Sequence, residues 1–101
     1  MNVAELLAEK REAIKAVCAK HGAFNVRVFG SAARGDFDDK SDIDILIKLD
    51  SSGFEGFQYF RVLDDLTAEL ESLLGHKVDV VDESGLRERI RSEVLSEAIA
   101  L

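Results

Sequence analysis

Two aspartates separated by one residue are the strongest chemical signal in the chain. Asp42 and Asp44 flank Ile43 where an apolar run begins, and this run predicts a strand from Ile43 to Leu49. Residues i and i+2 of a strand point to the same face about 6.6 Å apart. The two carboxylates would therefore repel each other, and one pKa would rise, unless a cation lies between them. A hard cation such as Mg²⁺ fits, because it takes oxygen ligands and shares its shell with substrate phosphates. The alternative is a solvated acidic strand end without a ligand.

A glycine and serine turn precedes these aspartates. The apolar pattern from Asn25 to Phe29 predicts a short strand, and Gly30 lets the backbone turn sharply without a side-chain clash. Ser31 is a preferred N-cap residue, and the helix formers after it predict a short helix whose free amides favour phosphate. A capped helix with no ligand is the alternative for the turn taken alone. Together with the paired carboxylates, the turn favours a metal and a nucleotide.

A third acidic residue interrupts a later apolar run. The β-branched residues between Lys77 and Val81 predict another strand, with Asp79 in its middle. An ionised carboxylate in a partly buried central strand is costly unless a positive group pairs with it. We therefore expect Asp79 to face a metal that Asp42 and Asp44 already hold. The alternative places Asp79 on a solvent-exposed face of the strand.

The chain resembles the polymerase-beta-type nucleotidyltransferase superfamily in its signature, G-S-A-A-R-G at 30–35 followed by S-D-I-D-I-L at 41–46. Its small size, the arginine inside the turn and the late Val-Asp-Val-Val strand make it similar to the minimal branch, the MNT antitoxins that pair with HEPN toxins. The resemblance covers nearly the whole chain. It implies a compact nucleotidyltransferase fold of the α/β (α+β) class, with a short mixed sheet backed by helices.

The resemblance also implies roles for the motif residues. Asp42, Asp44 and Asp79 would be the catalytic carboxylates and the metal ligands. Asp79 would help to bind a second metal ion and would activate the acceptor hydroxyl, as in two-metal in-line displacement. Gly30 and Ser31 would bind the phosphates of the nucleotide.

Arg34 lies inside the turn and has two open roles. It could contact phosphate, or it could pair with one of three nearby aspartates, Asp36, Asp38 and Asp39. These aspartates belong to a run of five acidic residues ending at Asp44, which only one lysine offsets. Local metal binding would account for much of this excess.

The implied reaction is Mg²⁺-dependent transfer of AMP from ATP to a hydroxyl, with release of pyrophosphate. By resemblance the acceptor is a tyrosine of a cognate HEPN ribonuclease toxin, which the modification inactivates, so that this chain would be the antitoxin. The rival hypothesis is a non-catalytic binding module that neutralises its partner by steric occlusion. It is motivated by the short chain and by spare apolar surface at Ala98–Leu101. Association with copies of itself or with the partner is left open.

Length and composition predict one domain over residues 1–101. A chain of 101 residues, 47% hydrophobic and 33% charged, can bury roughly 60 to 70% of its unfolded surface. Thirteen basic and 20 acidic residues give a net charge of −7, which opposes direct binding of nucleic acid. Template-using polymerases and aminoglycoside-modifying members of the superfamily carry added domains that we do not expect here.

Cysteine use and hydropathy predict a cytoplasmic protein. Cys18 is the single cysteine and cannot form an internal disulfide. No apolar run approaches the roughly 20 residues that span a bilayer, so no membrane association is expected. One cysteine and two histidines at predicted helix ends do not favour a zinc site.

The elements that must position the aspartates are a short mixed sheet and the helices behind it. Apolar spacing predicts long helices over about Val3–Lys20 and Gly56–Leu74, and a further helix with Ser84 as its N-cap. The strict alternation of isoleucine at 43, 45 and 47 predicts that this strand buries one face.

The second long helix also carries aromatic residues near its start. The cluster consists of Phe54, Phe57, Tyr59 and Phe60. We expect it to pack in the core rather than to form the floor of a base pocket.

Overall fold

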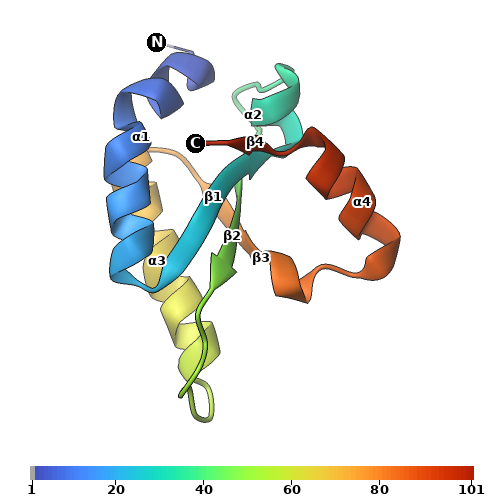
Figure 1. The fold of residues 1–101 in the computed structure, drawn as a ribbon. Helices are drawn as coiled ribbons and strands as arrows, with labels where there is room; N and C mark the ends of the chain where they lie inside the picture. Colours follow the sequence, from blue (N-terminus) through green and yellow to red (C-terminus); the bar gives the residue numbers. More distant parts are fainter. Residues whose placement is uncertain (1) are drawn as a thin grey trace.

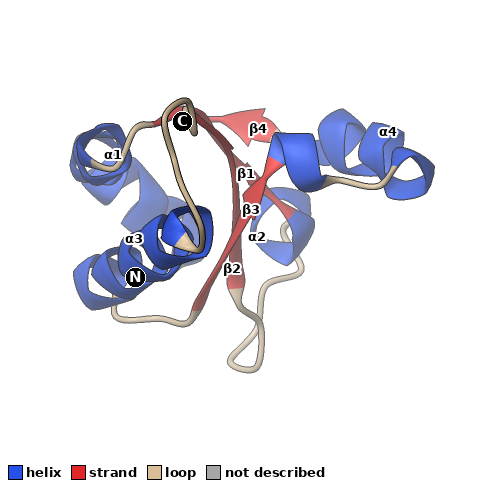
Figure 2. Cartoon of the chain, turned by 90° about the horizontal axis from the view of Figure 1, so that it is seen from below, coloured by secondary structure: helices blue, strands red, loops and turns tan. Residues whose placement is uncertain are grey.

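A four-stranded mixed sheet separates two layers of helices in the computed structural model, which describes residues 2–101 (Figure 2). The elements in chain order are α1 (Val3–Lys20), β1 (Ala23–Phe29), α2 (Gly30–Arg34), β2 (Ile43–Leu49), α3 (Gln58–Leu74), β3 (Val78–Asp82), the 3-10 turn η1 (Glu83–Gly85), α4 (Glu88–Glu97) and β4 (Ile99–Ala100). The strand order is β3-β2-β1-β4, with β2 and β3 parallel and the other pairs antiparallel. The predicted α/β fold with a short mixed sheet is confirmed.

The two faces of the sheet carry different side chains. The core face, which α1 and α3 cover, presents the three isoleucines of β2 at 43, 45 and 47, and each is fully buried. The opposite face, which we call the site face, presents Asp44, Leu46 and Lys48 of β2 toward α2, α4 and η1. The predicted alternation is confirmed for the isoleucines. Leu46 is nevertheless also fully buried, because η1 packs against β2.

The two long helices have recognisable ends. Asn2 caps α1 by accepting a hydrogen bond from the Glu5 amide at 2.8 Å, and the helix ends at His21. Gly75, in the left-handed conformation, ends α3. Within α1, Cys18 is fully buried, and burial raises the pKa of its thiol to about 11.

Ser84 is not the N-cap of the last helix, so that prediction was wrong. The Asp82 carboxylate accepts hydrogen bonds from the Ser84 amide and hydroxyl at 3.3 and 2.9 Å, which forms the separate turn η1. The backbone at Leu86 and Arg87 is then extended, and α4 begins at Glu88. The Asp82 side chain thus caps the separate turn η1, and α4 starts only after this turn has ended.

The aromatic cluster does not pack in the core as predicted. Phe57 and Phe60 are 82% and 61% exposed, because the loop before α3 and the first turn of this helix project past the end of the sheet (Figure 1). Tyr59 is partly buried, and its hydroxyl donates to Asp82 at 2.7 Å.

The C-terminal segment returns to the sheet. Ile99 and Ala100 pair with Val28 and Arg27 of β1, and the Leu101 amide donates to the Val26 carbonyl at 3.0 Å. Part of the predicted apolar surface is therefore used within the domain, although Ile99 remains 55% exposed. Within residues 2–101, no helix combines the length and apolar character that crossing a membrane requires.

Candidate active site

The three predicted carboxylates lie at one end of the site face. Asp44 is the second residue of β2, and Asp42 precedes it by two positions. Asp79 of β3 is paired in register with Asp44 across the parallel ladder, so the two side chains point to the same face. The fold therefore brings together residues that are 35 positions apart in the sequence.

Asp79 occupies a different environment from the one predicted. We expected a partly buried central strand, but β3 is an edge strand and Asp79 is exposed. The burial argument for a metal beside Asp79 was therefore wrong, and the alternative of a solvent-exposed face holds. Its position next to Asp44 does not depend on that argument.

Asp44 is the electrostatic centre of the group. Its pKa is raised to about 6, first by burial and then by the neighbouring carboxylates of Asp79 and Asp42, while Arg34 opposes them. Asp44 is partly buried, whereas Asp42 is exposed. The three negative charges therefore act on one another, which is the condition under which a divalent cation gains most from binding between them.

The donor set suits a hard cation in its chemistry. Carboxylate oxygens are the ligands that Mg²⁺ prefers, and after burial the negative charges of Asp79 and Asp42 are the next causes of the raised pKa of Asp44. Among residues 2–101, however, no three carboxylate, imidazole or thiol groups already converge as a metal site does. The carboxylates fit the ion in type and charge, and their side chains would have to turn toward it.

Gly30 is required where β1 turns toward Asp44. Its φ is +67°, and a Cβ at this position would overlap the Asp44 carboxylate. The prediction of a sharp glycine turn is confirmed. Ser31 is not the N-cap, because α2 already begins at Gly30 and Phe29 holds the cap position. The Ser31 carbonyl instead accepts the Gly35 amide at 3.0 Å.

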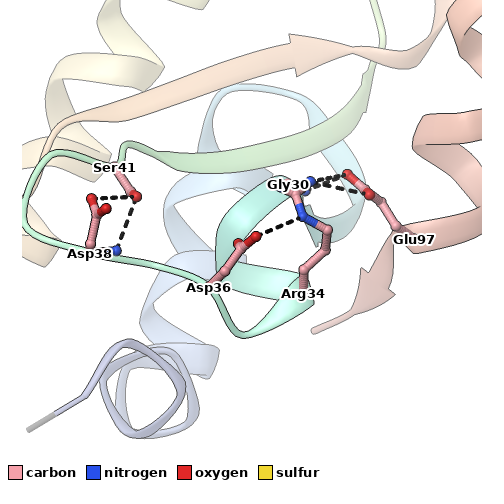
Figure 3. Close-up of polar contacts among 6 residues, drawn as sticks. All are labelled: Gly30, Arg34, Asp36, Asp38, Ser41 and Glu97. Atoms are coloured by element: carbon pink, nitrogen blue, oxygen red, sulfur yellow. Dashed lines mark hydrogen bonds and ion pairs between the residues drawn. The ribbon is translucent and has the colours of Figure 1, made fainter.

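Arg34 forms ion pairs on both sides of the turn (Figure 3). Its guanidinium lies 3.3 Å from Asp36 and 3.3 Å from Glu97. Of its two open roles, pairing with a nearby aspartate is the one observed, and Asp36 is the partner. Asp38 instead accepts from the Ser41 hydroxyl at 3.0 Å, so part of the acidic run organises its own loop.

Glu97 is the site residue that sequence reasoning missed. Its carboxylate accepts a hydrogen bond from the Gly30 amide at 2.8 Å as well as contacting Arg34, and its side chain is 24% exposed. No spacing signal joins positions 30 and 97. The contact arises because β4 pairs with β1 and so brings the end of α4 beside α2.

Most of these groups line a cavity of about 510 Å³, whereas Asp79 is not among its lining residues. The turn at Gly30 and Ser31 and the carboxylates of Asp42 and Asp44 form one side, and α4 forms the other with Ile90, Glu93, Val94 and Glu97. This volume is typical of a small-molecule site. A larger hollow of about 820 Å³ lies at the opposite end of β1 and β2, but it has no comparable group of charged side chains.

Comparison with known protein families gives a clear match. The model of the nucleotidyltransferase domain matches residues 10–101. A Methanocaldococcus jannaschii protein provisionally assigned as a protein adenylyltransferase is 34% identical over 98% of this chain and 97% of its own length. The protein adenylyltransferase MntA of Thermococcus cleftensis is 36% identical over 79% of this chain and 76% of its own length.

Two solved structures are similar to most or all of the fold. One, provisionally assigned as a minimal nucleotidyltransferase, has a TM-score of 0.84 and 44% identity, and it covers 100% of this chain and 97% of its own. The other is a toxin-antitoxin structure with AMP-PNP, with a TM-score of 0.69 over 88% of this chain and 69% of its own. At 21% identity, this second match supports the fold alone.

Proposed function

Because this chain belongs to the nucleotidyltransferase domain family and is an enzyme of that class, we propose that it transfers AMP from ATP to a hydroxyl of a partner protein. The observation that carries the proposal is the carboxylate group of Asp42, Asp44 and Asp79 beside the turn at Gly30 and Ser31. Two relatives named as protein adenylyltransferases support the choice of AMP and of a protein acceptor.

Each residue would act on a defined part of the reaction. Asp42 and Asp44 would hold Mg²⁺, with Asp79 as the third carboxylate, and Gly30 and Ser31 would bind the phosphates. When bound, the ion would neutralise charge on the phosphate oxygens. The acceptor oxygen forms a bond to the α-phosphorus while the bond to the bridging α,β oxygen breaks, and pyrophosphate leaves. Asp79 would accept the proton of the acceptor hydroxyl.

We further propose that the acceptor is a tyrosine of a cognate HEPN ribonuclease toxin. The sequence resemblance to MNT antitoxins supports this partner, and the similar fold found in a toxin-antitoxin structure with AMP-PNP agrees with it. Modification would inactivate the toxin, so that this chain acts as its antitoxin.

The test uses ATP labelled at either the α or the γ phosphate. Incubation with Mg²⁺ and the cognate toxin should label the toxin from α-labelled ATP only, with release of pyrophosphate, and peptide mass analysis should locate the label on a tyrosine. The Asp42→Asn, Asp44→Asn double variant serves as the inactive control. Labelling from the γ phosphate, or no labelling with a toxin that is active as a ribonuclease, would contradict the proposal.

A steric antitoxin is the second candidate, favoured by apolar surface on the C-terminal segment. Ile90, Leu95 and Ile99 are 41%, 36% and 55% exposed, and α4 contributes no buried residue. If occlusion were the mechanism, the double asparagine variant would neutralise the toxin as well as the parent does. Loss of neutralisation together with loss of labelling would support transfer.

A further inference from the structure

The Gly30 amide, which is proposed to bind phosphate, and the nearby guanidinium of Arg34 already hold an anion that belongs to this chain. The Gly30 amide donates to Glu97 Oε1 at 2.8 Å, and the Arg34 guanidinium lies 3.3 Å from both oxygens of the same carboxylate (Figure 3). Glu97 thus supplies negative charge where the phosphates of a nucleotide would supply it. Two anionic groups cannot share the single Gly30 amide without strong repulsion.

The helix that carries Glu97 is weakly attached. None of the residues of α4 is buried, in contrast to α1 and α3, which each bury three. Its polar attachments lie near its two ends, where Arg91 contacts Glu83 at 3.0 Å and Glu97 contacts the α2 turn. A helix held this way can move at small cost, because little apolar surface has to be exposed.

We propose that Glu97 is an intramolecular competitor for nucleotide phosphate, which occupies the Gly30 amide and the Arg34 guanidinium in the free protein and leaves when a polyphosphate binds. This inference rests on the proposed function, because it places the phosphates at that turn. Displacing a carboxylate favours ligands that bring several negative charges and a cation, so Glu97 would select nucleoside triphosphate over monophosphate. Release of Glu97 would also remove the contact between the end of α4 and the turn at Gly30, while Ile99 and Ala100 stay paired with β1.

The experiment compares the affinity of Mg²⁺·ATP for two variants by calorimetry. Glu97→Gln removes the charge of the competitor. Glu93→Gln is the matched control, because Glu93 lines the same cavity from the same helix, and its carboxylate carries no hydrogen bond or ion pair among the described contacts. We expect E97Q to bind at least about fivefold tighter than E93Q, since hydrogen bonds to charged groups are among the stronger ones in proteins.

Hydrogen exchange of α4 gives a second readout that does not depend on a variant. Adding Mg²⁺·ATP to the parent protein should speed exchange of the amides near Glu97, because the last turn of α4 loses the side-chain contact of Glu97 with Gly30 and Arg34. In E97Q these amides should exchange fast already and change little. Slower exchange in the parent would mean that α4 closes over the nucleotide with Glu97 in place, which would overturn the inference.

The outcomes separate the two proposals. If the parent labels the toxin but E97Q binds nucleotide no tighter than E93Q, Glu97 is not a competitor and the transfer function stands. Weaker binding by E97Q would make Glu97 a supporting group of the site and would also overturn the inference. If neither the parent nor any variant binds Mg²⁺·ATP or labels the toxin, the proposed function fails and the inference fails with it.

Discussion

The two faces of the sheet differ in what their side chains are arranged to do. On the core face, Ile43, Ile45 and Ile47 are fully buried under two long helices. On the site face, Asp44 lies near other negative charges, and no residue of the covering helix α4 is itself buried. The free energy of folding therefore comes mainly from the core face. The site face can then carry carboxylates that repel one another, and a bound ligand would reduce this repulsion. Substitutions on the two faces should accordingly change different properties.

The largest expected effect is on activity from the site face. The double variant Asp42→Asn, Asp44→Asn should lower AMP transfer by at least about a thousandfold, because neutral amides replace the charged ligands of the ion. Its melting temperature without metal should equal or exceed that of the parent, since like charges are removed. Asp39→Asn, an exposed change in the same loop, is the control and should leave transfer unchanged.

A core-face substitution should change stability instead. Ile45→Ala should lower the free energy of unfolding by about 2 to 5 kcal/mol, because it removes a fully buried side chain and leaves a cavity. Leu95→Ala on α4, where the side chain is 36% exposed, should cost less than about 1 kcal/mol. Urea denaturation measures both. Similar losses of unfolding free energy in the two variants would mean that both faces contribute equally to stability, which would contradict the difference inferred above.

Gly30 matters to both the fold and the site, because it follows β1 directly and leaves room for the Asp44 carboxylate. Gly35→Ala should cost about 1 kcal/mol, since only its left-handed backbone is strained and nothing lies near the added Cβ. Gly30→Ala should cost distinctly more and should also slow transfer, because the added Cβ would displace the Asp44 carboxylate. Urea denaturation and transfer rates measure the pair. Equal effects would argue against the close approach of Gly30 and Asp44.

The smallest expected effect is the pH dependence of stability in the presence of a chelator. The pKa of Asp44 is raised from 3.8 to about 6. Between these two pH values the folded state therefore holds a proton that the unfolded state has already lost. The contribution of Asp44 is therefore fully present below about pH 4 and is lost as the pH rises to about 6. We expect about 1 kcal/mol after allowance for solvent screening. Subtracting the stability profile of Asp44→Asn from that of the parent isolates the contribution of Asp44. Other carboxylates also contribute, such as Glu83, whose pKa is lowered mainly by Arg27.

The sequence pattern predicted those parts of the fold that depend on interactions between residues close in sequence. The alternating isoleucines of β2, the extent of α1 and the glycine turn at Gly30 follow from side-chain period and backbone freedom, and all three are confirmed. Ser31 and Ser84 were assigned as helix caps on residue type alone. In the first case α2 already begins at Gly30. In the second case Ser84 donates its hydroxyl hydrogen bond to Asp82, and α4 begins later, at Glu88.

The remaining features depend on strand order and on contacts between distant segments. Asp79 lies on an edge strand because β3 pairs only with β2, and sequence cannot specify that order. Glu97 reaches Gly30 only after a two-residue strand folds back onto β1. Neither position carries a local signal, since the chemistry of each depends on a neighbour from another part of the chain.

The buried thiol of Cys18 offers a reporter that the chain already contains. It lies in α1, on the opposite side of the sheet from the carboxylates, and a labelling reagent can reach it only when the core opens. Any molecule that binds the folded protein lowers the population of open molecules. Nucleotide should therefore protect Cys18 from alkylation without ever approaching it, and the degree of protection would give the binding affinity in an unmodified protein.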